Sequence, residues 1–508
     1  MATAAVRVTR KDGLERKTHT LLLVAIAGVI ALAHVATNGR YGFHRDELQF
    51  LSDARHMEWG FVAYPPLTPF VERISMAVFG LNMVGLRLAS VLAQAMAIVV
   101  TGLMARELGG GRLAQAVAAV SIALSPLPMF EATEFQYTTF DYLWWVLIAY
   151  CVIRLLKSEN PRWWLAIGVF AGLGLMTKYS IVFYIAGILG GFLLTRARRF
   201  LLNWYFAGAL VLTVLICLPN LLWQAHHQFI SYEFLQHIHR RDVGEGRAKG
   251  FWWKQLWLCA NLFAAPVWIA GLVAFVLSAR YRVLAWMYLI PVGLLALGQG
   301  RGYYTAGVYP MLLAMGAVAG ERWIVPMKAW LRRTLTMVYF AGVCGVGAAM
   351  AAVIVPIAPS GPLMRFALEN NGDLREEFGW QEMVQTVARI RDSLPPNQRA
   401  HLAITTGNYG EYGAIDILGR AYGLPEPIGT TNSEWYRGYP KNAPTTIIAL
   451  GIRPEEANAI FTNCRIAGHN GNSLGLDNEE SRDHPWIFVC GPPRLPAAEL
   501  WKKHRDFG

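Results

Sequence analysis

The chain has 508 residues, of which 54% are hydrophobic and only 16% are charged, and its mean hydropathy is +0.32. Soluble domains average about 25% charged residues, so this composition favours a polytopic membrane protein. A net charge of +12 would suggest a nucleic-acid partner for a soluble chain. Here, however, the basic residues cluster in short loops between apolar runs, which is the positive-inside pattern of membrane proteins. We therefore expect no nucleic acid among the partners.

Apolar runs long enough to cross the hydrocarbon core, roughly 17–25 residues each, recur along the first part of the chain. The expected spans are 19–37, 82–106, 112–130, 140–157, 162–177, 179–195, 201–220, 256–278, 283–299, 304–320 and 334–355. The short pair around 162–195 leaves a second interpretation open, one span followed by a re-entrant piece. In the first run, Ala31-Leu32-Ala33 mimics the cleavage site of a signal peptide, but the further spans favour a membrane anchor.

Alternate loops carry most of the Lys and Arg residues, which predicts that these loops and the amino-terminal tail lie in the cytoplasm. The outer loop 240-RRDVGEGRAKGFWWK-254 is strongly basic and breaks this rule, and an anionic substrate would explain it. The chain is thus expected to comprise a transmembrane domain, 1–355, and an extracytoplasmic domain, 356–508. The segments expected outside the membrane on its outer face are 38–81, 131–139, 221–255, 300–303 and the tail.

The tail turns polar from about residue 356, and Pro and Gly become frequent. Strand-like and helical stretches alternate in it, which predicts a small layered α/β domain. The expected helices are 380–394, 409–418 and 454–461, and the expected strands are 401–406, 445–451 and 485–490. Because the outer compartment tolerates disulfides, we expect Cys464 and Cys490 to pair.

Within the tail, 407-GNYGEYGAID-416 follows a strand and opens a helix, as phosphate-cradling loops do. It matches neither the dinucleotide fingerprint nor the Walker pattern, and an external domain would meet no nucleotide, so nucleotide binding is disfavoured. Two interpretations stay open, a structural turn and a contact to substrate through Tyr409, Glu411 or Tyr412. The aromatic run 435-WYRGY-439 is typical of a sugar-stacking surface or of domain packing, and packing is favoured.

The first external loop opens with a dense polar motif, 41-YGFHRDELQFLSDARHMEWG-60. Asp46 and Glu47 follow Arg45 at the start of an expected amphipathic helix that would lie along the membrane interface. An Asp-Glu pair in an ordinary loop is a solvated charged face, but carboxylates this close to a span are costly unless they have partners or a function. The prolines of 63-AYPPLTPFVER-73 then turn the chain back toward the membrane. We therefore predict a functional site at this motif.

Further polar groups are expected on the same outer face. They are Glu134, Tyr137, Asp141, Lys178, Arg240, Arg241 and Arg301, the last followed closely by Tyr303 and Tyr304. Carboxylates and cations together suit a reaction that activates a hydroxyl and releases a phosphate. A carboxylate can accept the hydroxyl proton, and Lys or Arg stabilises the charge of the leaving phosphate.

Four segments of the membrane part together resemble a known family: FHRDELQFLSDARHMEWGFVAYPPLTP, MFEATEFQYTTFDYLWW, GLGLMTKYS and LPNLLWQ. They are similar to bacterial GT-C superfamily membrane glycosyltransferases related to the dolichyl-phosphate-mannose protein mannosyltransferases. The same superfamily includes the aminoarabinose transferase that modifies lipid A. In the tail, ITTGNYGEYGAIDILG is similar to a segment of one bacterial branch. The resemblance implies a polytopic α-helical, GT-C-like membrane protein of about 11 spans, with a C-terminal extracytoplasmic α/β domain.

By this resemblance, Asp46 is the general base, and Glu47 orients it or contacts the sugar. Asp141 is a second acidic group near a sugar, and Lys178 grips the phosphate with an outer-loop Arg. The set expected to bind substrate is His44, Arg45, Tyr64, Pro65, Pro66, Glu134, Tyr137, Asp141, Lys178, Tyr179, Arg240, Arg241, Arg301, Tyr303 and Tyr304. Tyr64 departs from the family, in which His often precedes the two prolines, and this puts a proton relay there in doubt.

The implied reaction is an inverting transfer of one sugar from a polyprenyl-phosphate donor to lipid A, another envelope glycan or a protein. It requires no cofactor and no metal ligand is assigned, although the use of a divalent cation is left open. The expected location is the bacterial inner membrane, with membrane lipids as neighbours. The alternative, a polyprenyl-lipid flippase or transporter, is disfavoured because the chain shows no inverted repeat and its charges lie at the outer surface. A structural subunit of an envelope complex would leave the carboxylates and cations unexplained.

Overall fold

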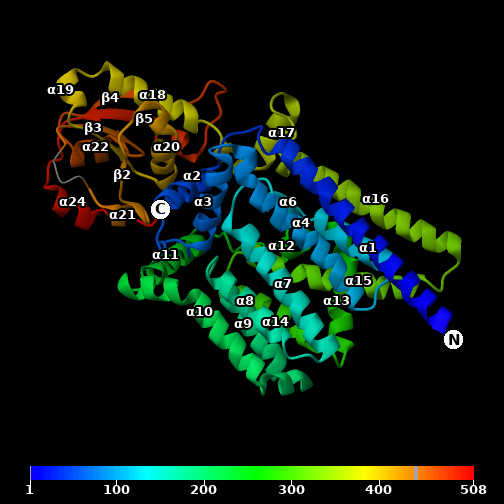
Figure 1. The fold of residues 1–508 in the computed structure, drawn as a ribbon. Coiled ribbons are helices and arrows are strands. Elements are labelled where there is room, and N and C mark those ends of the chain that lie inside the picture. Colours follow the sequence, from blue (N-terminus) through cyan, green and yellow to red (C-terminus); the bar gives the residue numbers. More distant parts are fainter. Residues whose placement is uncertain (1, 440–443) are drawn as a thin grey trace. The chain divides into compact units, whose positions relative to one another are not determined.

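The computed structural model describes residues 2–439 and 444–508 (Figure 1). Its internal contacts divide the chain into two compact units. Unit 1 consists of Met1–Asn38, Arg87–Leu222 and His239–Val355, and unit 2 consists of Gly39–Leu86, Trp223–Ile238 and Pro356–Gly508. The segment that contains the acidic motif therefore groups with the tail, although the membrane part separates the two in sequence.

The membrane part is built from helices, because a helix satisfies its own backbone N–H and C=O groups where no water is present. Its α-helices are α1 (Ala2–Thr37), α4 (Met83–Glu107), α5 (Arg112–Ala123), α6 (Pro126–Glu131), α7 (Tyr137–Ser158), α8 (Trp163–Leu175), α9 (Ile181–Leu193), α10 (Trp204–His226), α11 (Ile230–Gly244), α12 (Phe251–Trp257), α13 (Ala265–Leu277), α14 (Arg282–Leu297), α15 (Tyr309–Ile324) and α16 (Ala329–Ile354). Its 3-10 helices are η1 (Arg196–Leu201), η2 (Leu262–Ala264) and η3 (Gly302–Val308).

Five helices in the described part of the chain are long and apolar enough to cross a membrane: α4, α7, α10, α16 and the Thr18–Thr37 part of α1. A sixth span arises if α12 and the segment Leu262–Leu277, which meet at an angle of 91°, count as one. The helices α8 and α9 have 13 residues each, about 20 Å, which is shorter than the roughly 30 Å hydrocarbon core. An integral membrane protein is thus indicated, whereas the count of eleven spans is not confirmed.

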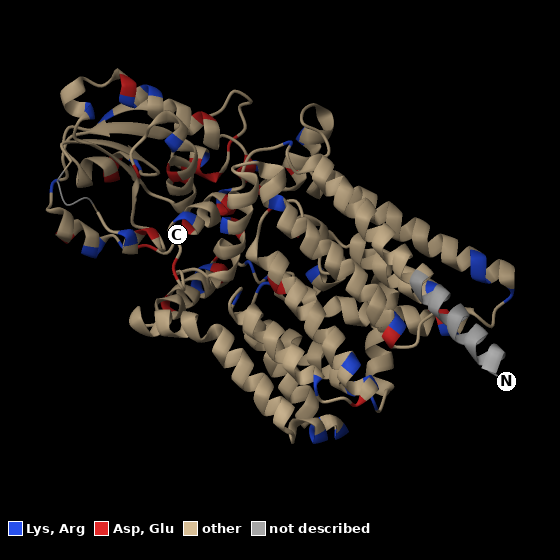
Figure 2. Cartoon of the chain, viewed as in Figure 1, with Lys and Arg blue, Asp and Glu red and all other residues tan. Residues whose placement is uncertain are grey.

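Charged residues are sparse along these helices and gather near helix ends (Figure 2). In α14, for example, Arg282 is the first residue and uncharged residues follow to Leu297. This distribution is typical of helices with a hydrocarbon-facing middle and polar ends.

Unit 2 combines the helices of Gly39–Leu86 and the segment Trp223–Ile238 with the α/β tail (Figure 1). Its α-helices are α2 (Arg45–Arg55), α3 (Leu67–Phe79), α17 (Pro362–Asn370), α18 (Trp380–Ser393), α19 (Pro396–Arg399), α20 (Tyr409–Leu418), α21 (Glu434–Arg437), α22 (Pro454–Ile460), α23 (Glu479–Asp483) and α24 (Ala497–Lys503). Two 3-10 helices are η4 (Gly372–Glu377) and η5 (Gly419–Tyr422), and the strands are β1 (Leu402–Thr406), β2 (Ile428–Gly429), β3 (Thr446–Leu450), β4 (Arg465–His469) and β5 (Trp486–Cys490).

The strands form one mixed sheet in the order β2-β1-β3-β5-β4. β1 is parallel to β2 and β3, and β5 is antiparallel to β3 and β4. Ile404 and Ile448 face a core shared with α2, α18 and α20. Ala403 and Ile447, which alternate with them along the strands, face a second core shared with α22. The sheet is therefore covered on both faces, and α2 is one of the covering helices.

The α/β part of unit 2 is also crosslinked. The structure joins Cys464 and Cys490 in a disulfide. Cys464 directly precedes β4, and Cys490 ends β5. The bond therefore links the edge strand β4 to its antiparallel neighbour β5.

Candidate active site

The helix α2 begins at the acidic motif because its first residues satisfy one another's backbone groups. His44 caps the helix, since its Nδ1 accepts a hydrogen bond from the Asp46 backbone N–H at 3.1 Å. Glu47 completes a capping box, because its carboxylate accepts from the His44 backbone N–H at 2.8 Å. Only 2% of Glu47 is exposed. The Glu47 carboxylate therefore fixes the start of α2.

Asp46 is the more accessible carboxylate of the pair, with 30% of its side chain exposed. Its Oδ1 accepts a hydrogen bond from the Tyr409 hydroxyl at 3.1 Å. Burial raises the pKa of Tyr409 well above its usual value, so the hydroxyl stays protonated and can donate. The Arg45 guanidinium lies 5.3 Å from the centroid of the same ring. A tyrosine of the tail thus contacts both the arginine and the aspartate of the motif.

Arg45 is surrounded by carboxylates of the tail. Its Nη1 lies 2.5 Å from Glu479, 3.5 Å from Glu480 and 3.9 Å from Glu376. Burial raises the pKa of Glu480 to about 7, although the charge of Arg45 opposes this shift. The guanidinium therefore ties the first turn of α2 to the tail.

Two glycines allow α2 to lie directly against α20. An added Cβ at Gly410 would come within 2.5 Å of Arg45 Cγ, and one at Gly413 would come within 2.4 Å of the Leu48 carbonyl oxygen. The stretch 407-GNYGEYG-413 is therefore the start of a helix whose small residues permit close packing. α2 is enclosed by this packing, because all residues from Glu47 to Ala54 are buried. This differs from the expected interfacial helix, which would keep one face against the membrane.

A second buried network holds the other end of α2. Asp53 is fully buried and is hydrogen-bonded to the Tyr64 hydroxyl and the Arg437 guanidinium. Burial raises the pKa of Asp53 to about 6, although Arg437 and Tyr64 lower it. Burial likewise raises the pKa of Glu434 to about 8, and Arg437 again opposes the shift. Tyr64 thus secures the turn that leads through Pro66 into α3.

One cluster within unit 2 has the residue types of a metal site. Ligand atoms of His56, Asp416 and Glu426 lie within 4.8 Å of one another. Asp416, however, accepts a hydrogen bond from Ser52 at 2.9 Å and pairs with Arg55. Against the effect of burial, His56 and Arg55 lower the pKa of Asp416. An ion-pair network therefore already holds the side chains of this cluster together.

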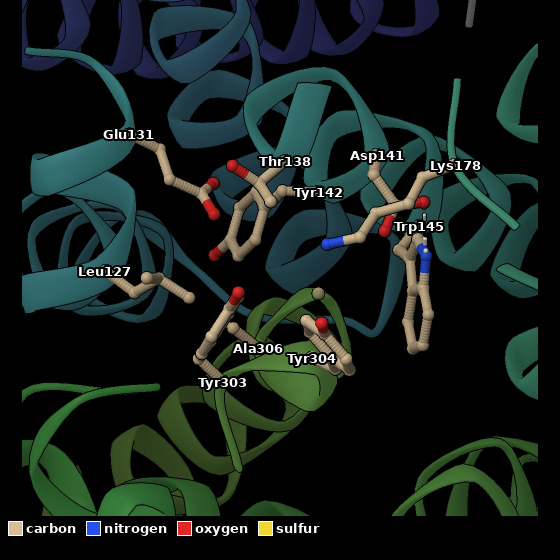
Figure 3. A pocket seen from close by; sticks show the side chains of 11 residues that line it. Leu127, Glu131, Thr138, Asp141, Tyr142, Trp145, Lys178, Tyr303, Tyr304 and Ala306 are labelled. Atoms are coloured by element: carbon tan, nitrogen blue, oxygen red, sulfur yellow. Dashed lines mark hydrogen bonds between the residues drawn. The ribbon is translucent and has the colours of Figure 1, made fainter. Parts of the chain in front are cut away.

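A pocket in unit 1 collects several of the predicted substrate-binding side chains (Figure 3). Its empty volume is about 250 Å³, which includes space open to solvent. The residues that line it are Leu127, Glu131, Thr138, Asp141, Tyr142, Trp145, Lys178, Tyr303, Tyr304, Ala306 and Gly307. They come from α6, α7, η3 and the turn between α8 and α9.

The Lys178 ammonium points into this pocket (Figure 3) and lies over tyrosine rings. Nζ is 4.7 Å from the ring centroid of Tyr137, 5.6 Å from that of Tyr303 and 4.3 Å from that of Tyr304. Among the residues that the structure describes, no carboxylate comes within the 4.0 Å of an ion pair with Nζ. Aromatic faces attract a cation without neutralising its charge. The ammonium can therefore pair with an anion that enters the pocket.

The two carboxylates of the pocket differ in their contacts. Asp141 Oδ1 accepts a hydrogen bond from Trp145 Nε1 at 3.0 Å, and its Oδ2 accepts from Ser180 Oγ at 3.1 Å. Glu131 is buried, and its Oε2 has no hydrogen-bond partner within the described residues. Both interact electrostatically with Lys178. Asp141 is thus fixed in orientation, while Glu131 presents an acceptor to the pocket.

Arg301 lies beside the pocket and is engaged by Asp242. Its Nε and Nη2 donate to the two carboxylate oxygens of Asp242, both at 2.6 Å. Its Nη1 donates to the Tyr303 hydroxyl at 3.5 Å. Arg240 and Arg241 directly precede Asp242 near the end of α11, and Arg241 lies in its last turn. The guanidinium of Arg301 therefore orients a pocket tyrosine and is itself held by an acid from the basic loop.

The structure brings the predicted residues together in two places. Unit 2 groups His44, Arg45, Asp46 and Glu47 at the start of α2, and the unit 1 pocket collects Asp141, Lys178, Tyr303 and Tyr304. Other predicted residues lie apart from the pocket lining: Pro65 and Pro66 before α3, the buried Glu134, and Tyr179, which donates to Asn220 Oδ1 at 3.1 Å.

Several lining residues were missed by the sequence prediction, and a signal for some of them exists. Thr138, Tyr142 and Trp145 recur with Asp141 at three- and four-residue intervals, which is the spacing of one helix face. Asp242 could have been singled out as an acid inside a basic loop. No local pattern links Glu479 or Glu480 to the acidic motif, because the contact depends on the tertiary fold.

Residues 63–223 match the family model described as dolichyl-phosphate-mannose-protein mannosyltransferase. The chain is 26% identical over 341 residues to the undecaprenyl phosphate-alpha-4-amino-4-deoxy-L-arabinose arabinosyl transferase of Pseudomonas paraeruginosa, covering 60% of each protein. It is 25% identical over 247 residues to the lipid A galacturonosyltransferase RgtD of Rhizobium johnstonii, covering 48% of this chain and 50% of that protein. The chain thus spans about half to three fifths of the length of these curated relatives.

Solved structures share the fold. ArnT from Cupriavidus metallidurans bound to undecaprenyl phosphate aligns with a TM-score of 0.59 and 14% identity, over 92% of this chain and 97% of that chain. The oligosaccharyltransferase of Archaeoglobus fulgidus tethered to an acceptor peptide aligns with a TM-score of 0.52 and 12% identity, over 80% of this chain and 64% of that chain. Together, these comparisons confirm that the chain resembles the GT-C membrane glycosyltransferases of the mannosyltransferase and aminoarabinose transferase-like kind.

Proposed function

We propose that this chain is an inverting glycosyltransferase that moves one sugar from a polyprenyl-phosphate donor to an acceptor outside the cytoplasm. The observation that carries the proposal is the Lys178 ammonium, held by tyrosine rings in a pocket and not paired with a described carboxylate. A lysine ammonium commonly binds phosphate in proteins, where it acts as a point charge. The names of the relatives support the donor, because one is named for undecaprenyl phosphate, and they favour lipid A as the acceptor.

The proposed reaction is a single displacement. Asp46 accepts the proton of the acceptor hydroxyl as general base, and the hydroxyl oxygen attacks the anomeric carbon. The bond between that carbon and the phosphate oxygen breaks, and its electron pair leaves with polyprenyl phosphate. Attack from the side opposite the leaving group inverts the anomeric configuration.

Each side chain then has a defined part in the chemistry. Lys178 stabilises the charge on the departing phosphate. Arg301 orients Tyr303, one of the rings over which the Lys178 ammonium lies. Glu47 fixes the first turn of α2, because its carboxylate caps the helix at His44. Because cationic side chains supply the positive charge, the proposed chemistry contains no metal ion, and transfer should persist in EDTA.

We further propose the inner membrane of a bacterium as the location, with the amino terminus in the cytoplasm and both Asp46 and the tail outside. The positive-inside distribution of Lys and Arg supports this orientation. A reporter fused after Gly508 should be active outside the cytoplasm, and one inserted in the loop at Arg280 should not be.

The test of the function is a donor panel. Membranes that contain the protein receive several polyprenyl-phosphate sugars together with lipid A, and the products are identified by mass spectrometry. Transfer predicts two products in equal amounts. One is lipid A whose mass has increased by one sugar residue, and the other is free polyprenyl phosphate. A flippase would move the donor between leaflets of a vesicle without forming a glycosidic bond, and that result would overturn the proposal.

A further inference from the structure

The geometry of unit 2 points to a role for the tail in the chemistry, and we propose that Tyr409 is a positioning residue for Asp46. This inference rests on the proposed function, in which Asp46 is the general base. The Tyr409 hydroxyl donates to Asp46 Oδ1 at 3.1 Å across 363 positions of sequence. The tail would therefore orient the base as well as pack against α2.

The contact is directional, because both partners are held from several sides. Asp46 lies in the first turn of α2, which the His44–Glu47 capping box fixes. Tyr409 is the first residue of α20, which Asn408 caps by accepting from the Gly410 backbone N–H at 2.6 Å. A rigid donor on a rigid helix is what holds a reacting group in a productive orientation.

The hydroxyl, together with the Arg45 guanidinium whose Nε lies 3.9 Å from Asp46 Oδ1, favours the form of Asp46 that the reaction needs. A hydrogen bond donated to a carboxylate stabilises the ionised state relative to the protonated state. Loss of the donor should therefore extend protonation of Asp46 to higher pH and reduce the fraction of enzyme that can accept a proton. It should also let the carboxylate rotate away from the acceptor.

Two parts of the Tyr409 side chain can be separated by mutation. The ring lies 5.3 Å from the Arg45 guanidinium, and the hydroxyl contacts Asp46. Tyr409→Phe removes the hydroxyl and keeps the ring, so the packing of α2 against α20 is preserved. Tyr422→Phe is the matched control, because it removes a hydroxyl of the same domain that accepts from Gln381 and Gln385.

The experiment measures initial rates of transfer against pH for the full-length protein, Tyr409→Phe and Tyr422→Phe. A lost hydrogen bond to a charged group predicts a fall in kcat of about tenfold for Tyr409→Phe. KM for the polyprenyl-phosphate donor should stay unchanged, and the acidic limb of the pH profile should move to higher pH. Tyr422→Phe should behave like the unmodified protein.

A second measurement uses the Asp46→Asn background. If the hydroxyl acts through Asp46, Tyr409→Phe adds no further loss there, which is the non-additivity of coupled groups. Equal pH profiles for Tyr409→Phe and Tyr422→Phe would overturn the positioning role. A fall in the kcat of Tyr409→Phe without a shift in the acidic limb of its pH profile would also overturn the positioning role. A purely structural role predicts that pattern.

These results are distinct from a failure of the proposed function. If the unmodified protein transfers no sugar from any donor, the function itself is wrong. If Asp46→Asn retains turnover, the assignment of the base is wrong. If Asp46→Asn is inactive and Tyr409→Phe matches its control, only the positioning role is wrong.

Discussion

Asp46 and Glu47 are adjacent in sequence, but the structure gives their carboxylates different surroundings. Glu47 is buried and accepts from the His44 backbone N–H, whereas Asp46 is partly exposed and accepts from Tyr409. A carboxylate that caps a helix is unsuited to exchange protons in each catalytic cycle, because the cap would be lost. At the scale of the residue, this difference favours Asp46 as the base of the proposed reaction.

Lys178→Gln tests the phosphate contact. The variant keeps a polar side chain but removes the charge, so transfer should fall by about 10²–10³, as when one electrostatic stabiliser of a transition state is lost. Lys157→Gln is the control, because Lys157 pairs with Glu107 at 3.1 Å on an exposed surface. The measurement is the steady-state rate of transfer from a polyprenyl-phosphate sugar for each variant and for the unmodified protein. Equal rates for the two variants would contradict the role of Lys178.

Glu434→Gln tests the buried network around Arg437. Burial raises the pKa of Glu434 from 4.5 to about 8, so folding favours the protonated form. This contribution to stability is fully present below about pH 4.5 and is lost as the pH rises through about 8. Between these values the free energy of unfolding should fall by up to about 1.4 kcal/mol per pH unit. The variant should flatten this decline in a series of thermal melts.

The matched control for that series is Glu455→Gln, at an exposed position of α22 in the same unit. Its melts should follow those of the unmodified protein at every pH. If the melts of Glu434→Gln also follow those of the unmodified protein, burial of Glu434 does not cause the predicted fall in the free energy of unfolding.

At the scale of elements, the packing of α2 against α20 determines where the acidic motif lies. Gly413→Ala would place a Cβ within 2.4 Å of the Leu48 carbonyl oxygen, and backbone cannot move aside cheaply. The variant should lose about 1–3 kcal/mol of stability and much of its transfer activity. Gly372→Ala is the control, because an added Cβ there meets no atom within 4 Å. Chemical denaturation and transfer assays of both variants check this, and equal stability would show that the helices do not depend on close approach.

Elements with a strong local pattern were predictable from the sequence. The helix 409–418 is α20 as expected, and the apolar run 445–451 contains β3, all of whose residues are buried. β4 was missed because it is an edge strand with mostly exposed residues, which lack the alternation of a half-buried strand. The runs 162–177 and 179–195 are expected either as two spans or as one span with a re-entrant piece, because hydropathy does not reveal that α8 and α9 each end after 13 residues.

At the scale of the whole molecule, the residue types of the site were predictable, but their grouping was not. The motif residues and Lys178 stand out as charges beside apolar runs. The contact of Asp46 with Tyr409 joins segments that lie 363 positions apart, and no periodicity encodes such a pairing. The composition shift near residue 356 likewise does not reveal that Gly39–Leu86 groups with the tail in unit 2.

The release of free polyprenyl phosphate by the purified, reconstituted protein and by Asp46→Asn tests the central claim most directly. With a polyprenyl-phosphate sugar and acceptor present, the unmodified protein should release one polyprenyl phosphate for each sugar transferred, with the new linkage inverted. Asp46→Asn should release less by about 10²–10⁴, the usual contribution of a general base, while melting at the same temperature. Undiminished release by Asp46→Asn, or sugar transfer with retained anomeric configuration, would contradict this account.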